Sequence, residues 1–194
     1  QPPAEWPESM PDKPSVQVPG NVTQLLDLTY AEYGPRKMLA DLFMPKGKGP
    51  YPAVLIIHGG GWIKGDKMKF RAMGLEMAKR GYVSMAIDYR LAEEARFPAN
   101  IQDCHAGVRY LRAHAAKYKI DPGKIGVVGG SAGAHLAGLL ATTTKVKSLH
   151  GNGGNAGFSS AVQAAVVMSG PMEISTGSVA ERSLTAVKPV ANAN

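Results

Sequence analysis

The sequence contains only one cysteine, Cys104, among its 194 residues. One thiol cannot form an internal disulfide or supply a cysteine-based zinc site. Cys104 falls on the apolar face of a predicted helix, which indicates a buried, unreactive thiol. The chain is nevertheless long enough, at 44% hydrophobic residues, to bury the core of one globular domain.

Long apolar runs and dense basic blocks are also absent. The candidate run YPAVLIIHGGGW is interrupted by His58 and glycines, well short of the roughly 18 to 20 residues that span a bilayer. The sequence therefore predicts a water-soluble chain with no membrane partner. The formal net charge is +7, but lysines and arginines are spread over several segments and mixed with acidic residues. This dispersion argues against a nucleic-acid partner.

The first 20 residues, QPPAEWPESMPDKPSVQVPG, are rich in proline and contain neither an initiating methionine nor an apolar signal segment. We expect residues 1–20 to be a structure-poor lead-in and residues 21–194 to belong to the folded domain. Such a start is typical of a mature secreted or periplasmic protein. A trimmed cytoplasmic protein would look the same.

Strand and helix signals alternate along the rest of the chain. Residues 21–32 and 37–47 predict an antiparallel hairpin joined by the turn sequence YGPR. Further strands are expected over 51–61, 82–91, 121–130 and 160–171, and helices over 66–80, 98–115 and 132–143. This order predicts an α/β fold, with a mostly parallel, doubly wound sheet behind an antiparallel N-terminal hairpin.

Ligands bind such sheets at the carboxyl ends of the parallel strands. One predicted strand end, GVVGGSAGAHLAG at 126–138, places Ser131 in a G-x-S-x-G pattern between a strand and a helix. Side chains at positions 129 and 133 would collide with the adjoining strand and helix, so the turn needs glycine there. The pattern indicates a nucleophilic serine, although a phosphate-binding turn uses similar glycines.

A second strand end, HGGGW at 58–62, is also rich in glycine. Three successive glycines let the backbone turn its N–H groups outward without obstruction. If these groups face Ser131, they and the N–H of Ala132 would stabilise the oxyanion that forms when a serine attacks a carbonyl.

The ordered set HGGGW, DYRL, FPA, Asp103 and GGSAG resembles the α/β-hydrolase superfamily, within it the hormone-sensitive-lipase-like branch and the bacterial feruloyl or acetylxylan esterase branch. The resemblance covers roughly residues 20–175. It implies that Ser131 is the nucleophile and that Gly60, Gly61 and Ala132 donate to the oxyanion. It implies a structural role for His58 and no metal or cofactor.

Other residues allow two interpretations each. Trp62 lines the substrate pocket or covers the sheet edge, and the first is favoured by its place beside the glycines. Asp103 is a buried carboxylate that braces the glycine loop, or simply a charge in the first turns of a helix. His135 is expected to pack on the helix that follows Ser131. His105 and His114 are expected at the surface or at the edge of the core.

The sequence departs from the family pattern near its C-terminus. In this fold the serine is followed by an acid and then a histidine, both on loops after later strands. After residue 175 the chain has Glu181 but no histidine, and His150 precedes the last predicted strand. We therefore expect residues 21–194 to be the N-terminal portion of one α/β-hydrolase domain, with the triad acid and histidine beyond residue 194. Completion of the site by another polypeptide is the alternative.

The predicted function is that of a serine carboxylic ester hydrolase acting through an acyl-enzyme. Its expected substrates are short acyl esters or carbohydrate-linked acetyl and feruloyl esters, as small molecules or on a polysaccharide. The sequence does not predict an oligomeric state. Two alternatives are a serine peptidase of the same fold and a non-catalytic binding member of it. A binding protein needs neither the serine turn nor the glycine loop, which argues against the latter.

Overall fold

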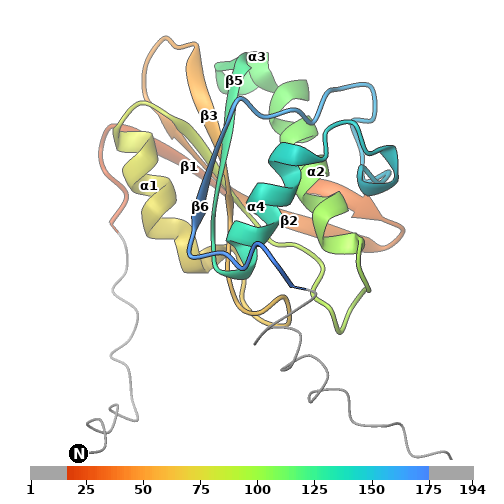
Figure 1. Ribbon diagram of the computed structural model, residues 1–194. Coiled ribbons are helices and arrows are strands. Elements are labelled where there is room, and N and C mark those ends of the chain that lie inside the picture. Colours follow the sequence, from red (N-terminus) through yellow and green to blue (C-terminus); the bar gives the residue numbers. More distant parts are fainter. Residues whose placement is uncertain (1–16, 175–194) are drawn as a thin grey trace, which may run out of the picture.

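The turn sequence YGPR closes the predicted hairpin between β1 (Val22–Tyr33) and β2 (Arg36–Pro45). Gly34 stands in this turn with φ of 58°, a conformation that favours glycine. The structure is a computed structural model that describes residues 17–174 (Figure 1). The predictions made for residues 1–16 and for Glu181 lie outside the described residues.

Within residues 17–174, six strands form one sheet in the order β1-β2-β4-β3-β5-β6. β2 pairs antiparallel with β4, whereas β4, β3, β5 and β6 all run parallel. The four parallel strands are β3 (Tyr51–Ile57), β4 (Val83–Ile87), β5 (Ile120–Gly130) and β6 (Ala164–Met168). The prediction of a mostly parallel sheet with an antiparallel N-terminal hairpin is therefore confirmed.

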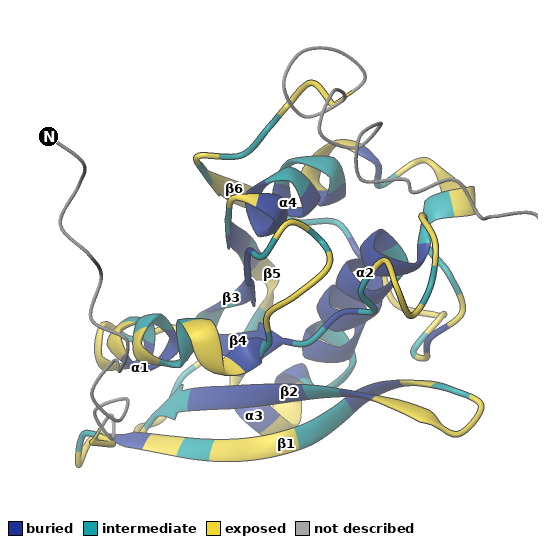
Figure 2. Ribbon diagram, turned by 90° about the horizontal axis from the view of Figure 1, so that it is seen from below, coloured by how far each residue is buried: buried dark blue, intermediate teal, exposed yellow. Residues whose placement is uncertain are grey.

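Helices cover both faces of the sheet because the buried strands are apolar on both sides. Leu55 and Ile57 of β3 belong to the main core, with residues of α2 (Ala99–Ala113) and α4 (Ala132–Thr142). Ile56 between them points to the opposite face, where α1 (Arg71–Lys79) packs. Figure 2 shows α2 almost wholly buried, whereas much of β1 is exposed.

The predicted helix over 66–80 is divided in two. A 3₁₀ turn, η1 (Lys67–Phe70), precedes α1, and the Asp66 side chain caps it by accepting from the Met68 N–H at 2.8 Å. Tertiary contacts hold this first turn: the Lys67 N–H donates to Asp88 at 2.7 Å, and its buried ammonium pairs with Asp27 at 2.8 Å. Local periodicity carries no information on these distant partners.

The helix predicted over 98–115 ends two residues earlier than expected. α2 stops at Ala113, and a separate turn, α3 (Ala115–Tyr118), follows. Tyr118 is buried, and its hydroxyl lies 3.0 Å from that of Tyr110 on α2, which redirects the chain. A second 3₁₀ turn, η2 (Lys147–Leu149), lies in the loop after α4.

Cys104 is fully buried, and burial raises the pKa of its thiol, so the prediction of an unreactive cysteine agrees with the structure. Across residues 17–174, no helix has the length and apolar character needed to cross a membrane.

The prediction for His105 was wrong. Its side chain is fully buried, with Nδ1 2.8 Å from the Ser160 hydroxyl and Nε2 3.3 Å from that of Thr143. Both hydroxyls come from the two ends of the loop between α4 and β6, a distant partner set that the helical spacing of His105 does not reveal. Burial, and then the charges of His150 and Arg109, lower the pKa of His105 to about 4.

This pKa makes stability depend on pH. Between pH 6.5 and about 4 the unfolded chain binds a proton at His105 that the folded chain does not, so stability is lost as pH falls through this window. The slope for one such group is at most about 1.4 kcal/mol per pH unit. In His105→Gln this slope should be absent, as measured by urea unfolding between pH 7.5 and 4.5. Parallel pH profiles for the variant and the parent would contradict the assignment.

Candidate active site

Ser131 occupies a strained turn between β5 and α4, with φ of 54° and ψ of −118°. Serine is a favoured N-cap residue, but Ser131 makes no capping hydrogen bond to α4. Its side chain is exposed, and no residue within 17–174 hydrogen-bonds its hydroxyl. A non-glycine residue in such a conformation costs on the order of 1–3 kcal/mol, and capping does not compensate for it.

The glycines on both sides of Ser131 have the steric basis predicted from the sequence. A Cβ on Gly129 would lie 2.1 Å from the carbonyl oxygen of Gly133. A Cβ on Gly133 would lie 2.2 Å from the carbonyl oxygen of Ile57, at the end of β3. Only glycine therefore lets β5 turn into α4 against the neighbouring strand.

The glycine loop after β3 lies directly against this turn. A Cβ on Gly59 would lie 3.1 Å from the Cβ of Ser131, so the two backbones are in close contact. Gly60 and Gly61 have φ of 140° and 62°, and the Gly60 carbonyl accepts from the Lys64 N–H at 3.1 Å. The loop thus folds back on itself beside the serine, at the lower edge of the sheet in Figure 1.

Among the backbone N–H groups of these two segments, those of Gly60, Gly61 and Ala132 have no acceptor in the described part of the chain. Ala132 is the first residue of α4, where N–H groups lack intrahelical partners and the helix dipole favours negative charge. The structure therefore brings the predicted serine and the predicted donor residues into adjacent segments.

His58 lies at the base of the glycine loop. It is buried, its Nδ1 is 2.9 Å from the Gly59 carbonyl oxygen, and its ring stacks on Tyr89 at 4.3 Å. Burial lowers the pKa of His58, which favours the neutral imidazole. These contacts give His58 a structural position, in agreement with the expectation from the sequence.

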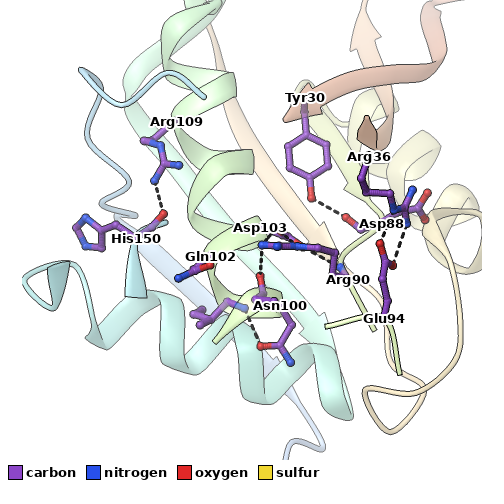
Figure 3. A network of polar contacts seen from close by, with 12 residues as sticks. Tyr30, Arg36, Asp88, Arg90, Glu94, Asn100, Gln102, Asp103, Arg109 and His150 are labelled. Atoms are coloured by element: carbon purple, nitrogen blue, oxygen red, sulfur yellow. Dashed lines mark hydrogen bonds and ion pairs between the residues drawn. The ribbon is translucent and has the colours of Figure 1, made fainter. Parts of the chain in front are cut away.

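Asp103 is fully buried and forms an ion pair with Arg90 in the loop after β4, at 2.8 Å (Figure 3). Asp103 also accepts from the Arg90 backbone N–H at 2.8 Å. It does not touch the glycine loop directly. The connection is indirect, because Ala92 in the same loop donates to the Trp62 carbonyl at 2.9 Å.

Loss of this ion pair should destabilise the fold. Asp103→Asn leaves the nearly buried Arg90 guanidinium without its counter-charge, which is expected to lower the free energy of unfolding by about 3 kcal/mol. Glu94→Gln removes the exposed ion pair with Arg36 beside the same loop and should cost less than about 1 kcal/mol. Chemical denaturation of both variants measures the difference, and equal losses would contradict the buried role of Asp103.

Trp62 follows the glycines and is half-buried, with φ of 64°. It lines a pocket of about 250 Å³ together with Ala92, Ala95, Phe97, Asn100, His135 and Ile174. Its indole meets the His135 ring edge to face, with 5.5 Å between ring centroids. The structure thus places Trp62 at a pocket wall, the position favoured from the sequence.

Neither a triad histidine nor a triad acid is hydrogen-bonded to Ser131 among residues 17–174. In the same range, no group of three or more His, Cys, Asp or Glu side chains is arranged to hold a metal ion. The described residues thus contain the serine turn and the glycine loop but not the groups that would move a proton.

Known proteins with similar sequences include esterases. The sequence profile of the BD-FAE family matches residues 40–193. A probable isoprenylcysteine α-carbonyl methylesterase of Arabidopsis thaliana is 34% identical over 127 residues, 65% of this chain and 26% of the plant protein. The chain spans about a quarter to two fifths of the length of the curated relatives that it matches.

Solved structures that resemble this chain are also esterases. A truncated carbohydrate esterase from gut microbiota is 32% identical with a TM-score of 0.71, over 79% of this chain and 58% of that one. Esterase 2 of Thermogutta terrifontis, phosphoramylated by tabun, is 27% identical with a TM-score of 0.70, over 86% and 62% of the two chains. The chain belongs to the BD-FAE family of α/β-hydrolase esterases.

Proposed function

We propose that this chain carries the nucleophile and the oxyanion hole of a serine carboxylic ester hydrolase. The single observation that carries the proposal is the Ser131 turn: a strained, uncapped, exposed serine beside the unpaired backbone N–H groups of Gly60, Gly61 and Ala132. Strain of this kind persists where the surrounding structure enforces it, and it clusters at active sites. A phosphate-binding turn would not need to hold a serine hydroxyl free of its own helix.

In the proposed reaction, the Ser131 hydroxyl oxygen attacks the ester carbonyl carbon while a histidine takes its proton. The N–H groups of Gly60, Gly61 and Ala132 stabilise the negative charge on the carbonyl oxygen. The C–O bond to the alcohol then breaks, the histidine returns the proton to the alcohol, and an acyl-enzyme remains. Water attacks the acyl carbon by the same steps and releases the acid and free Ser131.

We propose that the histidine and the acid that orients it come from the rest of a longer polypeptide. Two observations support this: the Ser131 hydroxyl has no such partner within residues 17–174, and the matched relatives are longer than this chain. The tabun-modified neighbour supports a nucleophilic mechanism, because organophosphorus agents react with activated nucleophiles.

The proposed substrates are short acyl esters or carbohydrate-linked acetyl and feruloyl esters. The carbohydrate esterase neighbour supports the second group. Polymeric substrates of this kind would place the enzyme outside the cytoplasm, as a secreted or periplasmic protein.

Hydrolysis by the full-length protein tests the proposal. p-Nitrophenyl acetate, methyl ferulate and acetylated xylan compare the three ester types, and an aminoacyl-p-nitroanilide tests for peptidase activity. We expect hydrolysis of at least one of the three esters and no detectable cleavage of the aminoacyl-p-nitroanilide. Faster cleavage of the amide would favour a peptidase, and cleavage of none would remove the enzymatic assignment.

A further inference from the structure

Lys67 is a buried lysine that follows closely after the glycine loop and begins η1. Its side chain is only 8% exposed, and lysines are rarely buried unless they are paired. The ammonium lies 2.8 Å from the Asp27 carboxylate on β1 and 3.6 Å from the Asp41 carboxylate on β2. Burial alone would lower the pKa of Lys67, but the hydrogen bond to Asp27 and the nearby carboxylates outweigh it and raise the pKa. The ammonium is therefore charged at neutral pH and pairs with both strands of the hairpin.

The backbone of Lys67 has a separate anchor. Its N–H donates to the side chain of Asp88, directly after β4, at 2.7 Å. Asp88 is itself fixed to the hairpin, because its carbonyl accepts from the Tyr30 hydroxyl at 2.6 Å (Figure 3) and its N–H donates to the Leu39 carbonyl at 2.9 Å. Strands β1 and β2 and the end of β4 thus hold one residue at the start of η1.

Strand β1 is distorted where it meets Lys67. Its pairing with β2 shifts register between Leu25 and Leu28, and Asp27 in this bulge has φ of 54°. The Asp27 N–H donates to the buried Asp41 carboxylate at 3.1 Å, so the partner strand holds the bulge. Bulges re-aim side chains, and here the Asp27 carboxylate is brought to the Lys67 ammonium. The hairpin is therefore shaped for this contact.

The position of Lys67 affects where the glycine loop lies, because the intervening backbone packs on that loop. Gly65, two residues before Lys67, has φ of 107°, and a Cβ there would lie 2.7 Å from the Gly59 carbonyl oxygen. A Cβ on Gly60 would overlap the Lys64 carbonyl oxygen, and the Lys64 N–H donates to the Gly60 carbonyl at 3.1 Å. These contacts join backbone to backbone. A shift at Lys67 would therefore displace Gly59 and Gly60 as well.

We propose that Lys67 is a positioning residue for the oxyanion hole. Its three carboxylate partners fix Lys67 on the hairpin side of the sheet, and Lys67 fixes the glycine loop against Ser131. The inference rests on the proposed ester hydrolysis and adds that the N-terminal hairpin supports that reaction from a distance. Small displacements matter, because a shift of about 1 Å in the groups that position a reaction can cost on the order of 100-fold in rate.

Lys67→Met in the full-length protein removes the ammonium and keeps an unbranched side chain. With the ester that the parent hydrolyses fastest, we expect kcat to fall about 10- to 100-fold, somewhat less than the loss of one oxyanion donor outright. KM should change by less than about threefold, because the donors act on charge that develops only in the transition state. Lys67→Arg keeps the positive charge and should retain kcat within about fivefold of the parent.

Arg109→Met is the control, because Arg109 is also a buried cation but anchors another loop. It is 3% exposed and donates to the carbonyls of Gly154 and His150 at 3.0 and 2.8 Å. Its loss should destabilise the fold, yet leave kcat of the folded enzyme within about twofold of the parent. The inference is overturned if kcat of Lys67→Met stays within about twofold of the parent, or if both variants lose kcat equally.

Asp88→Ala tests the same anchor by a second route, and replaces Lys67→Met if that variant does not fold. It removes the acceptor of the Lys67 N–H and keeps the ammonium. We expect kcat to fall in the same range, again with KM nearly unchanged. A kcat equal to that of the parent would overturn the inference.

Amide hydrogen exchange separates this inference from the proposed reaction, because it needs no turnover. It is measured by NMR on the full-length Ser131→Ala protein. The N–H groups of Ile63 and Lys64 donate to the Gly60 carbonyl at 3.2 and 3.1 Å. Their exchange rates therefore report whether the glycine loop keeps its fold.

Adding Lys67→Met to Ser131→Ala should speed exchange at these two amides about tenfold, since local opening of the loop becomes easier. Adding Arg109→Met should leave both rates unchanged. Faster exchange with Lys67→Met, in a protein whose parent hydrolyses no ester, would support the anchoring of the loop and count against the reaction alone. Unchanged exchange with Lys67→Met would overturn the inference.

Discussion

Ser131→Ala is expected to lower kcat for ester hydrolysis by the full-length protein on the order of a millionfold, the effect of losing the nucleophile in serine hydrolases. The fold should not change. Ser131 makes no side-chain hydrogen bond to a residue within 17–174. Alanine also carries a Cβ, so its backbone strain at φ of 54° is similar to that of serine. We therefore expect the free energy of unfolding to stay within about 0.5 kcal/mol of the parent value.

Ser148→Ala is the matched control, because Ser148 is an exposed serine in η2, outside the serine turn and the glycine loop. A fluorophosphonate probe should label the parent protein and the control at Ser131, and should leave Ser131→Ala unlabelled. Labelling of Ser131→Ala, or residual turnover within tenfold of the parent, would show that another residue is the nucleophile.

Gly133→Ala is expected to have the second largest effect, since it adds a Cβ where none fits. The added carbon would lie 2.2 Å from the Ile57 carbonyl oxygen and 2.5 Å from that of His58. Both atoms are backbone, so β3 and α4 must move apart. We expect the free energy of unfolding to fall by about 3 kcal/mol, at the upper end of overpacking effects. The same movement would separate the glycine loop from Ser131 and lower kcat.

Gly138→Ala provides the comparison within the same helix. Its nearest neighbour would be the Met172 sulfur at 3.4 Å, an ordinary van der Waals distance. Alanine is favoured over glycine in a helix interior by roughly 0.5–1 kcal/mol, so this variant should be slightly more stable than the parent. Thermal or urea unfolding of the two variants in parallel measures both effects. Similar stability of the two variants would refute the packing of α4 against β3.

The predictions that agree with the structure rest mainly on short stretches of sequence. The hairpin turn needs Gly34, and the serine turn needs glycine at 129 and 133, because a positive φ or a close backbone approach excludes other residues. Alternating strands and helices also sufficed for the sheet, since crossover rules leave few arrangements. The residues at the proposed reaction centre were therefore accessible from the sequence alone.

The prediction that was wrong, and the contacts that the sequence did not reveal, depend on segments that lie far apart in the sequence. β4 lies between β2 and β3 in the sheet, which brings the loop after β4 beside the glycine loop. Asp103 therefore holds this loop through Arg90, and His105 is buried by hydroxyls 38 and 55 residues away. Asn100 on α2 and His135 on α4 line one pocket because the two helices pack together. No spacing rule in one sequence reveals such pairs.

The central claim is that the Ser131 hydroxyl and the N–H groups of Gly60, Gly61 and Ala132 act on one carbonyl group. A crystal structure of the full-length protein after reaction with paraoxon tests it most directly. We predict phosphorus bonded to the Ser131 hydroxyl oxygen, with a phosphoryl oxygen within about 3.1 Å of those backbone nitrogens. An adduct on another side chain, or a phosphoryl oxygen that faces away from the glycine loop, would contradict the account.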